Sequence, residues 1–271
     1  MHSVTIENKV IMITGAFGLL GKTISKAMLD QNAKVIIADI NSNSENEVKN
    51  LLKETDESNY LIVHLDITKE KSCIDAIDAA INKFGKIDVL INNAAIDAKF
   101  DKENIGSVNQ SRFELYPMDL FKRSVDVNIN GTVLMTQVMC RQMLKQGFGN
   151  IINVASTYSL VSPNQSLYDF GDGNINYKPV DYIVTKSFIP NFTKYIAIFY
   201  AKENIRCNAI APHGIFNDHS EAFIQNFSNL SPMGRMADKN ELIGPFTFLA
   251  SDASSYMTGS ILTVDGGWTA W

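Results

Sequence analysis

Seven short apolar runs rich in β-branched residues recur along this chain, and longer amphipathic stretches separate them. The runs are Val10–Thr14, Lys34–Asp39, Tyr60–Leu65, Val89–Asn92, Asn150–Val154, Arg206–Ile210 and Ile261–Val264. Strands that are apolar on both faces are typical of a parallel sheet covered on both sides. The alternation of strands and helices therefore predicts an α/β fold, a doubly wound, seven-stranded and mostly parallel sheet with helices on both faces.

The stretches between the runs have helical periodicity. Gly21–Gln31 places Ile24 and Met28 on one face, and Cys73–Phe84 repeats this spacing. No linker rich in proline or serine and no internal repeat interrupts the pattern. We therefore expect residues 1–271 to form a single domain.

Three glycines follow the first run and precede the first helical stretch. Gly15 is placed for a tight turn, Gly18 for close approach to a pyrophosphate, and Gly21 for contact between helix and sheet. A phosphate at this point is stabilised by the positive N-terminal end of the helix. Glycine-rich turns also occur without any ligand, so the loop alone leaves a purely structural role open.

An acidic residue at the end of the second run strengthens the dinucleotide interpretation. Asp39 lies about 20 residues past the glycine loop, where a carboxylate accepts hydrogen bonds from the adenosine ribose. It would also repel a 2′-phosphate, and no basic residue precedes Lys22 in the loop. A Rossmann-like site that prefers NAD over NADP is predicted.

Composition and charge exclude several classes of protein. With 24 basic and 29 acidic residues the net charge is −5, which disfavours nucleic acid as a partner. The cysteines are odd in number and lack a CxxC spacing, so neither a disulfide framework nor a metal site is predicted. Met1–Lys9 has no signal-peptide core, and no apolar run approaches the roughly 20 residues that span a bilayer. We expect a cytoplasmic protein without membrane segments.

A set of short motifs occurs in a characteristic order. They are Thr14–Gly21, His64–Ile67, Asn92–Ala95, Val127–Asn128, Ile152–Ser156, Tyr182 with Lys186, Asn208–Pro212, Phe248–Asp252 and Val264–Gly267. Over essentially its whole length the chain resembles the short-chain dehydrogenase/reductase family, in its single-domain branch. The resemblance implies a mainly nucleotide-binding half, 1–95, and a catalytic and substrate half, 96–271.

The resemblance also implies catalytic roles for four residues. Tyr182 would be the general acid/base, with Lys186 one helical turn away lowering its pKa from about 10 and holding the nicotinamide ribose. Ser156 would hydrogen-bond the substrate oxygen, and Asn128 would support a water leading to Lys186. Taken singly, these residues could equally be a surface pair, a turn residue and a helix cap.

The cofactor residues implied by the resemblance come from six segments. They are Gly15, Phe17, Gly18, Leu19, Leu20, Gly21, Asp39, Asp66, Ile67, Asn93, Ala94, Tyr182, Lys186, Pro212, Ile215 and Asn217. The glycine spacing is typical of the extended branch that includes nucleotide-sugar epimerases and dehydratases, whereas the C-terminal motifs and the length are typical of the single-domain branch.

A long segment, 157–181, separates Ser156 from Tyr182 and must border the active site. Its aromatics, amides and carboxylates suit a polyhydroxylated ligand, although a loop that packs on its own aromatics remains an alternative. The candidate substrate residues are Tyr158, Tyr168, Tyr177 and His213, the last either beside the nicotinamide or exposed. This segment and the C-terminal end resemble flagellin-modification dehydrogenases associated with nonulosonic (sialic-acid-like) sugars.

Three functions remain open. The first is an NAD-dependent oxidoreductase that acts on a secondary alcohol or ketone of a sugar or nucleotide sugar, in carbohydrate metabolism. An NAD-retaining sugar epimerase or dehydratase is the second, and a non-catalytic dinucleotide sensor is the third. The resemblance further implies a homotetramer or homodimer built on Phe121–Lys145 and Val180–Lys202, and a lid at 216–232.

Overall fold

The computed structural model describes residues 4–41, 45–97, 111–169 and 176–270. Seven strands form one sheet. They are β1 (Val10–Thr14), β2 (Lys34–Asp39), β3 (Tyr60–His64), β4 (Val89–Asn92), β5 (Gly149–Val154), β6 (Ile205–Pro212) and β7 (Ile261–Val264). Their order is β3-β2-β1-β4-β5-β6-β7, and every neighbouring pair is parallel. The predicted fold class is confirmed, and the sheet is parallel throughout.

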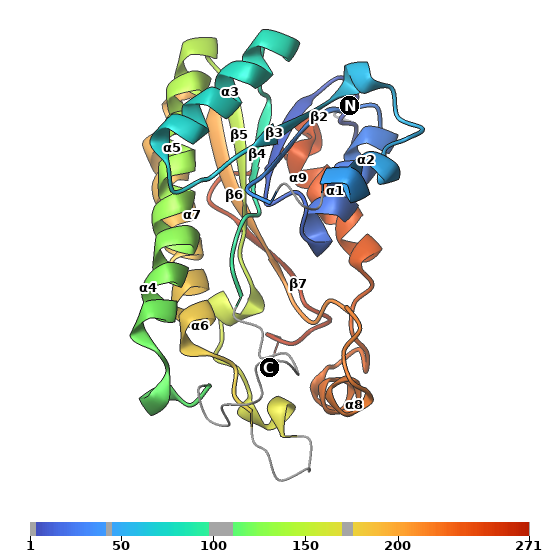
Figure 1. The fold of residues 1–271 in the computed structure, drawn as a ribbon, viewed down its shortest axis with the longest axis vertical. Coiled ribbons are helices and arrows are strands. Elements are labelled where there is room, and N and C mark those ends of the chain that lie inside the picture. Colours follow the sequence, from blue (N-terminus) through green and yellow to red (C-terminus); the bar gives the residue numbers. More distant parts are fainter. Residues whose placement is uncertain (1–3, 42–44, 98–110, 170–175, 271) are drawn as a thin grey trace.

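Helices cover both faces of the sheet (Figure 1). They are α1 (Leu19–Asp30), α2 (Glu45–Leu51), α3 (Glu70–Phe84), α4 (Met118–Val125), α5 (Thr132–Gln146), α6 (Val180–Ser187), α7 (Ile189–Phe199), α8 (Glu221–Leu230) and α9 (Ile243–Ala250). Buried side chains of α3, α5 and α7 pack on one face, and those of α1, α2 and α9 on the other. The two resulting apolar layers explain why the strands are apolar on both sides.

Some predicted boundaries were wrong. Strand β6 extends to Pro212 because its last residues pair with β7, and strand β5 begins at Gly149, which pairs with Ile205. Helix α1 starts at Leu19, because Leu19 and Leu20, which the sequence assigned to the glycine loop, already form its first turn. The predicted loop 157–181 is also shorter than expected, because Val180 already begins α6. Its residues 170–175 lie outside the described part of the chain.

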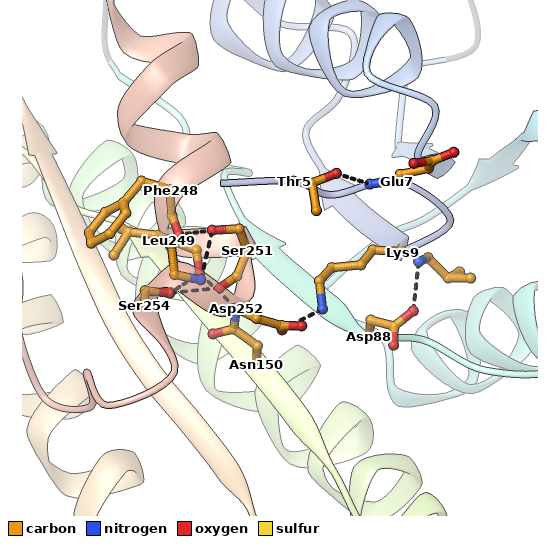
Figure 2. Close-up of polar contacts among 12 residues, drawn as sticks. Thr5, Glu7, Lys9, Asp88, Asn150, Phe248, Leu249, Ser251, Asp252 and Ser254 are labelled. Carbon is orange, nitrogen blue, oxygen red and sulfur yellow. Dashed lines mark hydrogen bonds and ion pairs between the residues drawn. The ribbon is translucent and has the colours of Figure 1, made fainter. Parts of the chain in front are cut away.

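The amino end of the sheet is fastened by polar contacts between segments distant in sequence (Figure 2). Lys9 forms an ion pair with Asp252 at 2.7 Å, and the Asp88 carboxylate accepts a hydrogen bond from the backbone of Val10 at 2.7 Å. The Asn150 amide and the Ser254 hydroxyl both donate to the carbonyl of Leu249. These contacts hold α9 against the strands and leave the opposite, carboxyl end of the sheet for the site.

Candidate active site

A cavity of about 800 Å³ opens at the carboxyl end of the sheet. The strand order reverses there, because β2 and β3 are added on one side of β1 and β4 to β7 on the other. Open α/β sheets bind ligands at such a switch point, outside the carboxyl ends of the strands. Residues following six of the strands line the cavity, so the fold brings together segments from both halves of the chain.

The glycine loop lies at one end of this cavity. Gly15 has φ +62°, and a Cβ at this position would lie 2.6 Å from the Cα of Ala94. Asn93 donates side-chain hydrogen bonds to the carbonyls of Thr14 and Gly15, at 3.1 and 3.0 Å. A side chain at Gly15 would therefore separate the loop from the end of β4.

Asp39 holds the glycine loop from the other side. Its carboxylate accepts hydrogen bonds from the backbone N–H of Phe17 and of Asn41, both at 2.8 Å. Asp39 thus fixes the loop as well as lining the cavity. This structural role adds to the ribose contact predicted from its position.

The loop can receive a phosphate group. Helix α1 begins after Gly18, which has no side chain to cap the helix, and the first turn contains no acidic residue. Leu19 and Leu20 line the cavity at this end. Uncapped N–H groups at a positive helix end are an anion site, so the residues present fit the pyrophosphate of a dinucleotide.

Ser156, Tyr182 and Lys186 line the same cavity. The Nζ atom of Lys186 donates to the carbonyl of Val154 at 2.7 Å and lies 5.9 Å from the centroid of the Tyr182 ring. Ser156 lies two residues after the end of β5, and its Oγ accepts a hydrogen bond from the backbone N–H of Tyr158 at 3.2 Å. Three residues from two distant segments therefore converge as the motifs predicted.

The pKa of Tyr182 differs from the expectation. Burial, and next the negative charge of Asp97, raise this pKa, while hydrogen bonding with Ser156 lowers it. Burial also lowers the pKa of Lys186 to about 8, which Asp97 partly opposes. Lys186, which donates to the carbonyl of Val154, is not among the causes of this shift in the protein alone, so burial and Asp97 set the direction of the Tyr182 pKa.

Asn128 occupies one turn of π-helix, Asp126–Gly131, between α4 and α5. Its side chain donates to the carbonyl of Ile96 and accepts from the N–H of the same residue, at 2.9 and 2.8 Å. It also donates to Thr185 on α6 at 2.9 Å. Asn128 does not line the cavity, so its contribution in this structure is to join the segment after β4 to the helix carrying Tyr182. Its predicted water contact stays a prediction.

An ion pair not predicted from the sequence lies beside Tyr182. The Nζ atom of Lys178 is 2.7 Å from both carboxylate oxygens of Asp97 and 4.2 Å from the centroid of the Tyr182 ring. Both residues line the cavity. Asp97 lies two residues after the Asn92–Ala95 motif, but no local pattern indicates that a residue 81 positions later will meet it.

Aromatic side chains form the wall at the substrate end. Tyr158 and Tyr168 line the cavity and share a hydrogen bond between their hydroxyls at 3.2 Å. His213 also lines it, packed against the rings of Tyr158, Phe227 and Trp268. His213 is 8% exposed, so the alternative of an exposed loop histidine was wrong.

Tyr177 is placed differently from the expectation. Its ring faces the guanidinium of Arg112 at 5.8 Å, and it is not among the residues that line the cavity. The neighbouring Lys178 lines the cavity instead. Tyr177 is therefore withdrawn as a substrate residue.

Most predicted cofactor residues line the cavity. They are Gly15, Phe17, Gly18, Leu19, Leu20, Asp39, Asp66, Ile67, Asn93, Ala94, Tyr182, Lys186, Pro212, Ile215 and Asn217. Gly21 does not, since it packs within the loop, where a Cβ would lie 2.4 Å from the carbonyl oxygen of Gly15. The contacts of all these residues with a cofactor stay predictions.

The predicted lid segment reaches the cavity through α8. Phe223 and Phe227 of this helix line the cavity, together with His219 and Met236. The sequence had shown only the apolar spacing of these phenylalanines. Movement of this segment as a lid stays a prediction.

A family model described as enoyl-(acyl carrier protein) reductase matches residues 15–269, which include every site segment above. The chain belongs to the short-chain dehydrogenase/reductase family. It is therefore an oxidoreductase of alcohol groups that works with a nicotinamide dinucleotide.

Relatives within this family have different names. The chain is 30% identical to post-translational flagellin modification protein A of Campylobacter coli, over 97% of this chain and 99% of that protein. It is 31% identical to 7alpha-hydroxysteroid dehydrogenase of Bacteroides fragilis, over 97% of this chain and 95% of the relative.

A solved structure agrees in fold. A short-chain dehydrogenase from Leptospira borgpetersenii with bound NAD+ superposes with a TM-score of 0.82 at 32% identity, covering 98% of this chain and 94% of the other. The described part of the chain therefore adopts the family fold.

Within the part of the chain that the structure describes, no helix is long and apolar enough to cross a membrane.

Proposed function

We propose that this short-chain dehydrogenase/reductase uses NAD to interconvert a secondary alcohol and a ketone on a polar substrate, a sugar or nucleotide sugar. The observation that carries the proposal is a single cavity with Asp39 and the glycine loop at one end and Ser156, Tyr182 and Lys186 at the other. This arrangement supplies a dinucleotide cradle and a proton-transfer group in one space.

When bound, the nicotinamide ring supplies the hydride acceptor or donor and, in its oxidised form, a positive charge. Tyr182 would take the proton from the alcohol during oxidation and return it during ketone reduction. Ser156, on the neighbouring segment, would donate a hydrogen bond to the reacting oxygen and stabilise developing negative charge. Lys186, held by Val154, would keep a positive charge near the tyrosine.

Asp39 supports NAD as the preferred cofactor. Its carboxylate lines the cavity at the adenosine end and is fixed by the N–H groups of Phe17 and Asn41. A 2′-phosphate there would meet a fixed negative charge, so we expect NAD to give the higher kcat/KM.

Polar groups at the substrate end favour a hydroxylated substrate. The hydroxyls of Tyr158 and Tyr168 and the Lys178–Asp97 ion pair offer donors and acceptors, and aromatic rings can stack on a sugar face. The flagellin-modification relative is consistent with this class. Phe223 and Phe227 provide an apolar wall, so the steroid named for the second relative belongs among the compounds tested.

The proposal is tested by NADH absorbance with sugars, sugar phosphates, nucleotide sugars and a hydroxysteroid, each with NAD and NADP. We expect turnover with a carbohydrate and NAD, and loss of at least 100-fold in kcat in Tyr182→Phe with NAD binding retained. Turnover that survives this substitution would contradict the assignment of Tyr182. Turnover of the steroid alone would contradict the substrate class, and product formation without net NADH would instead support the epimerase or dehydratase.

Three further properties complete the proposal. A cytoplasmic location fits the free thiols of Cys73, Cys140 and Cys207, which are all buried. The division into a nucleotide half and a substrate half, with 216–232 as a lid, fits the residues lining the two ends of the cavity. A homo-oligomer fits exposed apolar residues on α6 and α7.

A further inference from the structure

A second lysine, Lys178, lies closer to the ring of Tyr182 than the expected partner Lys186 does, and it is paired with Asp97. The Nζ of Lys178 is 4.2 Å from the centroid of the Tyr182 ring, against 5.9 Å for Lys186. Lys178 is held by both oxygens of Asp97, at 2.7 Å each. The lysine side chain is only 13% exposed and the aspartate 38%, so water screens the pair incompletely.

Both residues are anchored through their own segments. The backbone N–H of Lys178 donates to the side chain of Gln165 at 2.9 Å. Asp97 follows Ile96, whose backbone is bound on both sides by the side chain of Asn128. The two charges are thus held at defined positions beside the ring rather than on free surface side chains.

A cation above the face of a tyrosine ring favours its ionised form. The negative charge of a phenolate spreads into the ring, so the attraction to Lys178 grows when the proton leaves. A nearby carboxylate has the opposite effect, and Asp97 already raises the pKa of Tyr182. The pair therefore applies two opposed charges to one titrating group.

The other groups facing Tyr182 do not form such a pair. Lys186 donates to a backbone carbonyl, and the hydroxyls of Ser156, Tyr158 and Tyr168 are neutral hydrogen-bonding groups. Asp181, the preceding residue on α6, is fully buried and accepts a hydrogen bond from Ser124 on α4. Among the described residues of the cavity wall, Lys178 and Asp97 form an ion pair whose lysine lies over this ring.

We propose that Lys178 and Asp97 are positioning residues that act through Tyr182, with Lys178 stabilising the tyrosinate and Asp97 restraining its formation. The proposal rests on the assignment of Tyr182 as the acid/base group. It adds a second lysine, Lys178, to the proton-transfer site. The stabilisation of the tyrosinate by this lysine is opposed by its carboxylate partner Asp97.

The test measures the ionisation of Tyr182 without any substrate. The NAD-loaded protein carries 3,5-difluorotyrosine at position 182, whose fluorines lower the pKa and give a single ¹⁹F resonance. We expect Lys178→Met to raise the titration midpoint by roughly one pH unit and Asp97→Asn to lower it by roughly one unit. Lys178→Arg keeps the charge, so its titration midpoint should stay near that of the parent protein. The midpoint of the double variant should lie between those of the two single variants.

An exposed ion pair provides the matched control. Lys71 and Asp75 on α3 form a pair at 2.8 Å and do not line the cavity. Lys71→Met and Asp75→Asn remove the same charges and should leave the midpoint within about 0.3 unit of the parent, because surface charges at a distance are screened. Shifts of the same sign in Lys178→Met and Asp97→Asn, or shifts no larger than the controls, would overturn the proposal.

Kinetics then separate this proposal from the proposed function. With a substrate that the enzyme turns over, the acidic limb of the pH profile of kcat/KM should move to higher pH in Lys178→Met and to lower pH in Asp97→Asn. If Tyr182→Phe keeps its activity while the ¹⁹F midpoints move as expected, the charge pair acts on Tyr182 but the catalytic assignment fails. If Tyr182→Phe is inactive and the midpoints do not move, only the charge-pair proposal fails.

Discussion

At the scale of single residues, burial decides how the titratable groups of this site behave. Tyr182, Lys186 and His213 all lie in a cavity wall where water is scarce, and burial is the largest cause of each pKa shift. Each shift favours the neutral form of its group, as expected for low dielectric surroundings. The Lys178–Asp97 ion pair adds two further charges to the same cavity wall.

His213 makes the stability of the protein sensitive to acid. Burial lowers its pKa from 6.5 to about 4, so the folded state stays neutral where the unfolded state already binds a proton. Stability is thus complete above pH 6.5 and is lost as the pH falls toward 4, by on the order of 3 kcal/mol.

Chemical denaturation between pH 4 and 7 checks this for His213→Phe, which keeps a ring among Tyr158, Phe227 and Trp268. The variant should lose less stability on acidification than the parent protein. Equal pH slopes in the two proteins would show that His213 does not titrate as inferred.

At the scale of elements, helix α8 depends on one glycine for its position. Gly214 has φ +57°, and a Cβ there would lie 2.0 Å from the ring of Phe227, which also lines the cavity. Phe227 of α8 can therefore occupy its place in the cavity wall only because Gly214 has no side chain.

Gly214→Ala should displace Phe227 and with it α8. Gly234→Ala is the matched control, because Gly234 has a similar φ of +66° but no atom within 4 Å of a Cβ. Both variants should lose about 1–2 kcal/mol from backbone strain. Only Gly214→Ala should also raise KM several-fold and speed hydrogen exchange in α8. Equal effects in both variants would contradict a role for the Phe227 contact.

Expectations at this scale succeeded where the signal was local. The strands β1, β2, β4 and β7 have the predicted boundaries, because continuous apolar runs mark buried parallel strands. The start of α1 was missed by two residues because Leu19 and Leu20 were assigned to the glycine loop, and that of α3 by three because its first turn is polar. The course of segment 157–181 could not be predicted, as it depends on contacts with α8 and with the segment after β4.

At the scale of the whole molecule, exposed apolar side chains gather on α6, which carries Tyr182, and on the following helix α7. They are Val184 on α6 and Tyr195, Ile198 and Phe199 on α7, with Ile198 80% exposed. A helix with apolar residues outside its core-facing side needs further cover. A second copy of the chain would supply it.

Ile198→Asp combined with Phe199→Asp should therefore convert the protein to a monomer. Burying two charges without partners at an interface is strongly unfavourable. Gel filtration with light scattering measures the mass, and Leu51→Asp on α2, at a separate edge of the molecule, is the control (Figure 1). A monomeric parent protein, or a dimer that survives the double substitution, would contradict this interface.

The sequence by itself determined the doubly wound, seven-stranded α/β fold class and the glycine loop with Asp39, and through the family resemblance it brought Ser156, Tyr182 and Lys186 into one site. Each of these is recognised from short runs of neighbouring residues, because an apolar run or a glycine turn constrains the local structure wherever it occurs. Only the tertiary structure decided that Lys178 meets Asp97 beside the tyrosine, that His213 is buried, and that Tyr177 lies away from the cavity. These placements result from packing between segments far apart in the chain, which no local pattern encodes.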